Sequence, residues 1–441
     1  MNHDSRWIRT VSNNCLCTGC GLCQAYAGPD KLSVEISSEG YFRPRQLSEL
    51  TANTETVLRE ICPGIHIEHD PNQINGSYHP IWGPYRRLLR GMASDPRRRH
   101  MGSSGGAITA LAAYLLDSGK VDFILHNAPS AENPLYNTMQ KSGSSDDLMR
   151  GTGSRYSPSA PLINFMKFLS EPGHFGLIAK PCDLAALHNY AKFDPRVSEK
   201  IRYTLSFFCA GVPSLNGTRS LIAEFGIDEA ELKSLRYRGH GWPGSFVVET
   251  KGGKRKEMSY EASWDLLAEY LQFRCKICPD GVGEFSDVSC GDAWHLTKDQ
   301  PDFSERPGVS VILSRTDRGD RLVEEAIDAG YLSVSNLDFH ELDRMQPHQS
   351  TRKKHIKARV FALSLLGIET PNFGHIELDA AAKLSGVRSR VRAFFGTMTR
   401  ILFGLSYETP RILSRWLRIG PSKSARKKSA RPDADRRANK K

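Results

Sequence analysis

The chain has 441 residues, of which 39% are hydrophobic and 25% are charged. This balance excludes wholesale disorder, and the length suits two or three domains. No apolar run reaches the ~18 residues of a membrane span, and the first residues lack the apolar core of a secretion signal. We therefore expect a cytoplasmic protein. Its ten cysteines then serve as metal ligands, redox groups or buried apolar residues rather than disulfides.

The net charge of +11 is concentrated at the C-terminal end. Residues 418–441 carry ten Lys or Arg and two Asp, a contribution of +8 that leaves +3 for the rest. This stretch has no apolar periodicity, so we expect a solvated, disordered basic tail. It either keeps the protein soluble or contacts an anionic partner, and charge alone gives no specific nucleic-acid site.

The chain divides into four segments. Residues 1–80 form a cysteine-bearing module, residues 81–345 alternate strand-like and helix-like stretches, residues 346–417 are mostly helical and basic, and residues 418–441 are the tail. The alternation predicts an α/β (α+β) body with at least partly parallel strands. The elements expected there are a helix capped by Ser103 and Ser104 and ending at Gly119, strands over Val121–Leu125, Phe175–Ala179 and Tyr203–Phe208, and a helix capped by Asp183 that runs through Tyr190.

Four cysteines stand together near the N-terminus, at Cys15, Cys17, Cys20 and Cys23. The spacing Cys17-x2-Cys20-x2-Cys23 is that by which one loop wraps three irons of a cubane cluster. Glycines between them let the backbone amides turn toward the sulfurs. The fourth ligand stays open between Cys62, which precedes a proline as in bacterial ferredoxins, and Cys15. A zinc ribbon, which uses two separated Cys-x2-Cys pairs, is the alternative.

A second group of cysteines lies in the body. Cys275 and Cys278 form a Cys-x2-Cys pair, and Cys290 follows. Cys182 and Cys209 each fall just past the carboxyl end of a predicted strand, the edge at which α/β sheets assemble ligand sites. These thiols form either a second cluster or a set of buried apolar residues.

Three loops carry candidate ligand-binding residues. Arg97–Gly106 joins an arginine run to small residues and a helix N-terminus, which suits the phosphate of a nucleotide cofactor. Gly151–Tyr156 is a second small-residue loop that either closes over the same ligand or is an ordinary turn. Arg236–Gly244 combines cations, aromatic rings and glycines. Within it His240 either donates a proton to a substrate or is structural, and Asp292 either binds a cofactor hydroxyl or caps a turn.

Taken together, these motifs resemble those of the coenzyme F-420 hydrogenase/dehydrogenase beta-subunit family. The matching features, in family order across about residues 12–345, are Cys17-x2-Cys20-Gly21-x-Cys23, Gly102–Gly106, Gly153–Tyr156, Lys180–Asp183, Cys209–Gly211, Arg274-Cys275-x2-Cys278 and Gly291–Trp294. Members include beta subunits of deazaflavin-reducing hydrogenases and formate dehydrogenases. Others are iron–sulfur flavoproteins that reduce hydroxymethyl chlorophyll a or the vinyl group of divinyl chlorophyllide.

The resemblance implies an FAD-binding core with an N-terminal ferredoxin-like iron–sulfur module and one or two [4Fe-4S] clusters. The residues implied to hold the flavin are Ser103, Ser104, Gly105, Gly106, Thr109, Ser154, Arg155 and Tyr156, with Asp292 as a further candidate. The implied cluster ligands are Cys17, Cys20, Cys23 and Cys62, and Cys182, Cys209, Cys275 and Cys278. The chain departs from the family at Ala27, where many members have a cysteine.

We therefore expect an FAD- and iron–sulfur-dependent oxidoreductase. Electrons would pass between a ferredoxin-like donor, or a partner oxidoreductase subunit, and a small organic acceptor or coenzyme F-420. His240 and Arg238 are the candidates for binding or protonating the acceptor. The alternatives are a non-catalytic electron-transfer subunit and a basic-tail adaptor for a membrane or nucleic acid, and self-association stays open. Val391–Arg418 resembles an interfacial amphipathic helix interrupted at Pro410, which would place the protein at the inner membrane face; helices packed on the body are the alternative.

Overall fold

The centre of the protein is an eight-stranded mixed sheet, seen in a computed structural model that describes residues 4–74, 76–406 and 408–410. In order across the sheet, its strands are β18 (Leu332–Asn336), β6 (Arg87–Ala93), β17 (Ser310–Ser314), β14 (Val288–Asp292), β10 (Ile201–Phe207), β9 (Phe175–Ala179), β7 (Phe123–Pro129) and β8 (Asn137–Ser142). The four central strands β14, β10, β9 and β7 run parallel to one another. The pairs β14–β17, β17–β6, β6–β18 and β7–β8 are antiparallel. The expectation of a partly parallel α/β body is confirmed.

Both faces of the sheet are covered. Successive side chains of a strand point to opposite sides, so neighbouring residues of one strand enter different apolar cores. On β7, Ile124 joins a core with helices α5 (Ala107–Asp117) and α13 (Asp317–Asp328). Its neighbour Leu125 joins a different core, which includes helix α8 (Pro181–Tyr190) and the N-terminal module. The sheet therefore separates two apolar layers, and α8 lies between the sheet and the module.

Several elements match the sequence-based expectation, but two helix starts differ, and β7 begins two residues later than the predicted strand Val121–Leu125. Strand β9 has the predicted bounds. Ser103 and Ser104 are not the caps of α5, because the chain stays irregular until Gly106, which occupies the left-handed region (φ +74°) directly before the helix. Asp183 is not the cap of α8 either. The helix begins at Pro181, which is favoured in the first turn, and Asp183 lies inside that turn.

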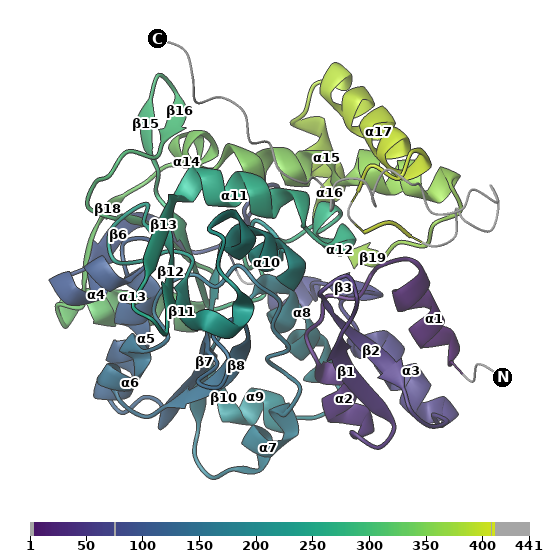
Figure 1. Cartoon of the computed structure of the whole chain (residues 1–441), viewed down its shortest axis with the longest axis horizontal. Coiled ribbons are helices and arrows are strands. Elements are labelled where there is room, and N and C mark those ends of the chain that lie inside the picture. Colours follow the sequence, from purple (N-terminus) through teal and green to yellow (C-terminus); the bar gives the residue numbers. More distant parts are fainter. Residues whose placement is uncertain (1–3, 75, 407, 411–441) are drawn as a thin grey trace.

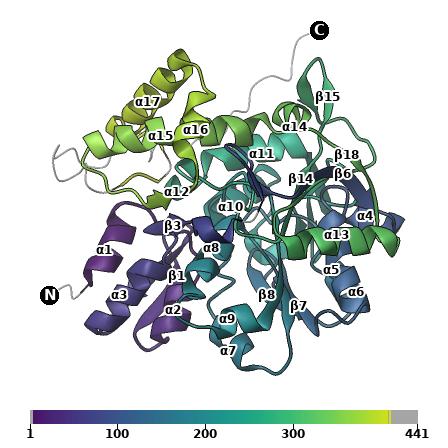
Figure 2. The ribbon, with the colours of Figure 1, turned by 180° about the vertical axis from the view of Figure 1, so that it is seen from behind.

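The N-terminal module is built from α1 (Arg6–Asn13), α2 (Leu22–Ala27), β1 (Leu32–Ile36), β2 (Phe42–Gln46), α3 (Ala52–Ile61) and β3 (His66–Glu68). Its buried side chains, among them Trp7 and Leu58, continue into the same apolar core as Leu177 and Leu184 of the body. The module therefore packs directly on α8. In Figures 1 and 2 it lies beside the sheet, below the C-terminal helices.

A smaller antiparallel sheet carries the aromatic loop. It consists of β11 (Leu232–Arg236), β12 (Ser245–Thr250) and β13 (Arg255–Ser259), packed against α10 (Leu215–Glu224) and α11 (Tyr260–Glu269). The remaining short elements of the first 345 residues are η1 (Pro71–Gln73), β4 (Ser77–His79), β5 (Gly83–Tyr85), α4 (Pro96–Met101), α6 (Ser145–Met149), α7 (Phe165–Ser170), α9 (Arg196–Lys200), η2 (Glu229–Glu231), α12 (Phe273–Lys276), β15 (His295–Thr297), β16 (Gln300–Asp302) and α14 (Phe339–Met345).

The C-terminal region is mostly helical, as expected, in the part that the structure describes. It comprises α15 (Pro347–Leu365), β19 (Asn372–Gly374), α16 (Leu378–Lys383) and α17 (Val387–Leu402). Strand β19 pairs with β3, so the end of the chain is joined to the N-terminal module. The predicted tail, 418–441, and residues 411–417 lie outside the described residues. Among the helices described, none combines the length and apolar character needed to cross a membrane.

Candidate functional site

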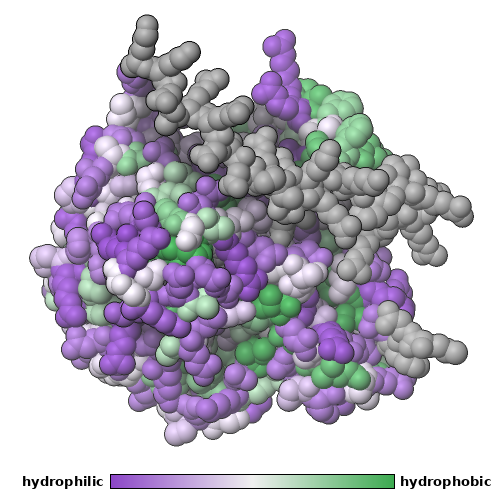
Figure 3. Space-filling view, viewed as in Figure 1, coloured by the Kyte–Doolittle hydropathy of each residue, from purple (hydrophilic) through white to green (hydrophobic). Residues whose placement is uncertain are grey.

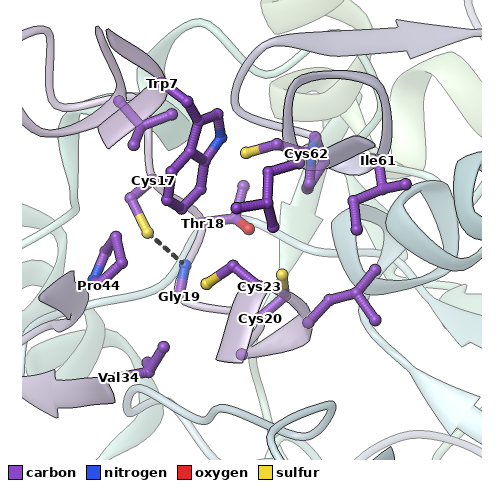
Figure 4. Close-up of a pocket in the computed structure, with 15 residues that line it drawn as sticks. Trp7, Cys17, Thr18, Gly19, Cys20, Cys23, Val34, Pro44, Ile61 and Cys62 are labelled. Atoms are coloured by element: carbon purple, nitrogen blue, oxygen red, sulfur yellow. Dashed lines mark hydrogen bonds between the residues drawn. The ribbon is translucent and has the colours of Figure 1, made fainter. Parts of the chain in front are cut away.

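Four cysteines of the N-terminal module line one buried cavity (Figure 4). Cys17, Cys20 and Cys23 come from the loop that opens α2 and from its first turn, and Cys62 directly follows α3. We call these four residues the first thiol set. Cys15 does not line the cavity; it is buried against a separate apolar cluster that includes Phe273. Of the two candidates for the fourth position, the fold therefore brings Cys62 to the other three.

Close packing of the loop backbone explains the glycines between these cysteines. Gly21 has φ +89°, and a Cβ added there would lie 2.8 Å from the backbone nitrogen of Ile163. Gly19 is also left-handed, and its amide donates a hydrogen bond to the Cys17 Sγ at 3.3 Å. The backbone thus turns one N–H toward a sulfur, as the sequence pattern predicts.

Burial makes the first thiol set an unfavourable place for bare thiolates. Burial, then the charge of Asp183, raises the pKa of Cys20 to about 12. Burial, then the charge of Cys17, raises the pKa of Cys62 to about 11. The four groups therefore need a positively charged partner to ionise together. The Trp7 side chain lines the same cavity, and its interaction with Cys62 partly offsets the rise in the pKa of that thiol.

A second set of four thiols lies at the edge of the main sheet. Cys182 opens α8 after β9, Cys209 lies two residues past β10, and Cys275 and Cys278 belong to α12 and the turn after it. We call them the second thiol set. Their charges act on one another: burial, then the charge of Cys275, raises the pKa of Cys209 to about 12. Parallel β9 and β10 end at the same edge, which is why Cys182 and Cys209 meet.

Polar donors and cations surround the second thiol set. The Val212 amide and the Gln272 side-chain amide donate to the Cys275 Sγ at 3.3 and 3.4 Å. Burial raises the pKa of Cys278, against the opposing charges of Arg274 and Arg352. Cys290, the remaining cysteine of the body, lies in β14 within the apolar core, and burial alone raises its pKa to about 12. It is a core residue outside the set.

No three His, Cys, Asp or Glu side chains in the described part of the chain converge closely enough to hold one metal ion. The sulfurs of the first thiol set instead face a wider shared space (Figure 4).

Buried polar groups connect the two thiol sets. The Lys180 ammonium contacts both carboxylate oxygens of Asp183 at 2.7 Å, and both side chains are almost fully buried. Charges in this pair act on Cys182 and on Cys20. Arg274, next to Cys275, donates a hydrogen bond to the carbonyl of Pro63 at 3.0 Å. The two sets are therefore neighbours in the folded chain although they are distant in sequence.

The small-residue loop before α5 is held against the main sheet. The Gly105 amide donates to the Ser310 Oγ at 2.9 Å, and the Ser104 hydroxyl donates to the Val309 carbonyl at 3.0 Å. A Cβ on Gly105 would lie 2.7 Å from Gly91 and Ser310 backbone atoms. The Ser103 hydroxyl is buried and has no hydrogen-bond partner among the residues that the structure describes. Thr109, half-buried, follows in the first turn of α5.

Arg155 is engaged within the protein rather than free to bind a ligand. Its guanidinium donates to the Asn137 side chain at 2.7 Å and to the carbonyls of Leu235 and Pro134 at 3.0 and 2.7 Å. These contacts hold the loop Gly153–Tyr156, and with it Ser154, against the smaller sheet. The Tyr156 ring packs on Trp264, with ring centroids 4.8 Å apart.

Arg238 and Asp292 form a buried bidentate ion pair. Two guanidinium nitrogens contact the two carboxylate oxygens at 2.9 Å each, and Arg238 is 2% exposed. The Trp242 indole also donates to Asp292, at 2.9 Å. Arg238, expected to contact the acceptor, and Asp292, expected to bind a cofactor hydroxyl, are thus engaged with each other. The pair positions the loop that carries His240.

An open groove runs beside this loop, with a volume of about 550 Å³. It is lined by Arg236, His240, Trp242, Tyr260 and Phe303, among others. Partial burial, followed by the charges of Arg236 and His100, lowers the pKa of His240. The lowered pKa favours the neutral form of the His240 imidazole. It is exposed, so it is available to a molecule in the groove.

The first two turns of α15 join the aromatic loop to the second thiol set. Gln346, directly before the helix, donates to the Asp292 carbonyl at 2.7 Å, and Arg352 donates to the Cys209 carbonyl at 2.7 Å. Six residues of helix span about 9 Å. These residues were missed by sequence reasoning, because no local motif marks a distant helix that contacts two loops.

Comparison with protein families identifies the class. Residues 88–167 match the family model for the N-terminal part of the beta subunit of coenzyme F420 hydrogenase/dehydrogenase. Residues 173–339 match the model for the C-terminal part of the same family. The chain therefore belongs to this family of oxidoreductase subunits, and the resemblance seen in its motifs is confirmed.

Individual relatives include several proteins of methanogens. The coenzyme F420 hydrogenase subunit beta of Methanothermobacter thermautotrophicus is 25% identical over 66% of this chain and 99% of its own length. The coenzyme F420-dependent sulfite reductase of Methanocaldococcus jannaschii is 21% identical over 80% of this chain, which spans about half (52%) of that protein. A beta subunit of F420-dependent formate dehydrogenase from Methanococcus maripaludis is 24% identical over 55% of this chain and 59% of its own length.

The fold resembles a solved structure. A chain of the F420-reducing [NiFe] hydrogenase complex from Methanosarcina barkeri superposes with a TM-score of 0.53 at 20% identity, over 67% of this chain and 98% of that chain. The likeness confirms the α/β architecture of the body.

Proposed function

We propose that this protein is an iron–sulfur flavoprotein oxidoreductase. It would carry two [4Fe-4S] clusters and one FAD, and would exchange electrons between a ferredoxin-like donor or partner subunit and a small organic acceptor or coenzyme F420. The observation that carries the proposal is the assembly of two buried sets of four thiols from distant parts of the chain.

The residues of both thiol sets fit clusters. Each set has four cysteines, the number that a cubane cluster requires. Burial raises the thiol pKa values, so a cationic group must compensate four thiolates. The Trp7 indole and the amides directed at Cys17 and Cys275 supply donors of the kind that surround cluster sulfurs.

The loop before α5 fits part of a flavin. The Ser103 hydroxyl is buried without a partner among the described residues, and glycines at 102, 105 and 106 let the loop pack closely against neighbouring backbone. We infer that Ser103–Gly106 and Thr109 contact the flavin. The wall of the proposed flavin site beside this loop is formed by Ser154, Arg155 and Tyr156. Arg155 has a structural role there, because its guanidinium donates to backbone carbonyls. The Arg238–Asp292 ion pair fixes the loop 236–244 on the other side of the proposed flavin site.

Clusters pass single electrons, whereas a flavin exchanges either one electron or a hydride, so the combination joins one-electron donors to two-electron acceptors. The chain's own residues hold these sites in a row. The Lys180–Asp183 pair and Arg274 connect the two thiol sets, and the first turns of α15 connect the second set to the aromatic loop. The groove with His240 lies at the end of this row and is the proposed acceptor site.

Cysteine substitutions in matched pairs test the proposal. We expect Cys62→Ser to remove about half of the bound iron, and Cys15→Ser to leave it unchanged, since only Cys62 lines the cavity. Likewise Cys275→Ser should remove about half, and Cys290→Ser should not. Iron content and the visible spectrum of anaerobically purified protein measure both. Equal losses for both members of a pair would refute the assignment of that set.

A non-catalytic electron-transfer subunit is the second candidate, and membership of a family of beta subunits favours it. The two functions differ in what the isolated chain does with coenzyme F420. Turnover with reduced ferredoxin, or with an artificial one-electron donor, supports the enzyme. Reduction of the clusters and flavin without turnover supports the non-catalytic role.

A further inference from the structure

Helix α17 presents an apolar stripe to solvent. Val387, Val391, Phe395 and Leu402 recur at helical spacing and are 65%, 47%, 61% and 41% exposed. The opposite side of the helix, with Ala393, Thr397 and Ile401, is buried. One face of α17 therefore packs on the protein, and the other face is exposed to solvent. Figure 3 shows hydrophobic residues gathered over α17 at the upper right.

The stripe continues onto α15. Phe361 and Leu365, at the end of that helix, are 57% and 60% exposed. The centroids of the Phe361 and Phe394 rings are 5.8 Å apart, and those of Phe394 and Phe395 are 5.1 Å apart. Nine of the twelve exposed large hydrophobic residues in the described ranges fall within 361–405, so the patch is local to this region.

The same region carries the positive charge of the protein. Residues 386–441 contain sixteen Lys or Arg and three Asp or Glu, a net +13, whereas the whole chain has +11. The first 385 residues therefore carry −2. Arg388 and Arg392 are exposed and follow the stripe along one side of α17.

We propose that α17 and the adjoining end of α15 form a peripheral docking surface for an anionic lipid bilayer, as a property separate from the redox function. The apolar stripe would enter the boundary between headgroups and acyl chains, while Arg388 and Arg392 contact lipid phosphates. A nucleic acid would satisfy the charges and leave the apolar stripe in water, so the combination favours lipid.

Vesicle flotation of the full-length chain tests this surface. Vesicles of phosphatidylcholine alone are compared with vesicles that also contain phosphatidylglycerol. We expect binding to the anionic vesicles, weakened by salt, and little binding to the neutral ones. The double variant Val391→Ser/Phe395→Ser should bind at least about tenfold more weakly, because two exposed apolar side chains no longer leave water. Phe193→Ser, a residue 45% exposed on the body, should bind like the original protein.

Charge variants and a truncation separate the contributions. Arg388→Gln/Arg392→Gln should weaken binding to anionic vesicles by about fivefold per arginine. Absence of flotation with either vesicle would overturn the proposal. So would loss of binding on truncation after Pro410 together with no effect of the stripe variant, which would assign binding to the tail. A dimer that Phe395→Ser dissociates, with no vesicle binding, would assign the surface to a second copy instead.

Discussion

Lys180 and Asp183 show how a single buried pair supports the site. Their charges neutralise each other between the two thiol sets, where little water reaches either group. A buried ion pair adds little net stability, yet removing one partner leaves an uncompensated charge. We therefore expect Lys180→Met to lower the free energy of unfolding by about 3–5 kcal/mol.

Lys120 provides the matched control for that substitution. It pairs with Glu325 at 3.0 Å, at positions 29% and 41% exposed. Because exposed pairs contribute less than about 1 kcal/mol, Lys120→Met should hardly change stability. Denaturant titration of both variants measures the difference, and similar losses would contradict the role given to burial.

His188 gives a prediction for pH. Burial, followed by the charge of His69, lowers its pKa from 6.5 to about 4, and its Nε2 has no hydrogen-bond partner within the described ranges. The unfolded chain thus takes up the proton first as the pH falls. The stability that His188 contributes is complete above pH 6.5 and is lost progressively toward pH 4.

The size of this effect is accessible through a variant. Between neutral pH and about pH 5, the original protein should lose about 2 kcal/mol more stability than His188→Gln. Unfolding curves at the two pH values give the double difference. A pH dependence unaltered by the substitution would show that His188 does not bind the proton.

Residue chemistry alone could not assign the charged candidates. Arg155 and Arg238 are residue types that bind anions, and the sequence placed both at ligand loops. In the folded chain, backbone carbonyls surround one and Asp292 pairs with the other. Which cation is free depends on partners 18 to 80 residues away, and local spacing carries no information on them.

At the scale of elements, the loop that opens α2 depends on one close backbone approach. Gly21→Ala would introduce a Cβ 2.8 Å from the Ile163 backbone at a residue with φ +89°. Gly226, with φ +62°, has no atom of the described chain within 4 Å of its added Cβ. Both substitutions carry the strain of a left-handed alanine, of order 1 kcal/mol, but only the first adds a collision.

We therefore expect Gly21→Ala to be the more destabilising of the two and to lower iron content, and Gly226→Ala to keep it. Thermal unfolding and iron analysis of both variants provide the comparison. An intact iron content in Gly21→Ala would mean that the loop tolerates a shift and that its geometry is not required.

Periodicity predicted the elements with strong patterns and missed starts that depend on backbone geometry. The short apolar run Phe175–Ala179 gave β9 with its bounds, and the apolar series after Ser104 gave α5. The start of α5 shifted to Ala107 because Gly106 takes a left-handed conformation, which a cap preference for serine does not anticipate. Pairing such as β14 with β17 is antiparallel and non-local, so its direction could not be read from either strand.

At the scale of the molecule, α15 locks the C-terminal region to the rest. The Lys353 ammonium contacts the Glu284 carboxylate in the interior, and the same carboxylate accepts hydrogen bonds from His69 and Tyr78. Burial opposes ionisation of Glu284, but the charges of Lys353 and His69 outweigh it and lower its pKa to about 2. Three segments of the chain therefore meet at one carboxylate.

Lys353→Met should loosen this region. With Glu284 left without its cation, α15 would open more often, and we expect limited trypsin digestion within 346–410 to be at least about tenfold faster. The neighbouring Lys354 contacts Asp343 at 3.7 Å near the surface, and Lys354→Met should be digested at the original rate. Equal digestion rates for the two variants would contradict the anchoring role given to the Lys353–Glu284 ion pair.

The first thiol set illustrates what whole-chain folding adds to a motif. Three of its cysteines, Cys17, Cys20 and Cys23, lie close together in the sequence and were expected at one site. The choice between Cys15 and Cys62 was not decided, because it depends on α3 returning the chain to the loop. The second thiol set draws on three segments, and only the shared edge of β9 and β10 indicated that two of its members would meet.

Iron, sulfide and flavin analysis of the anaerobically purified protein, with its visible spectrum, tests the central claim most directly. We predict about eight irons and eight sulfides with one FAD per chain, since two sets of four thiols each hold a cubane cluster. About four irons with FAD would mean that one thiol set holds no cluster. Zinc without flavin would contradict the redox function altogether.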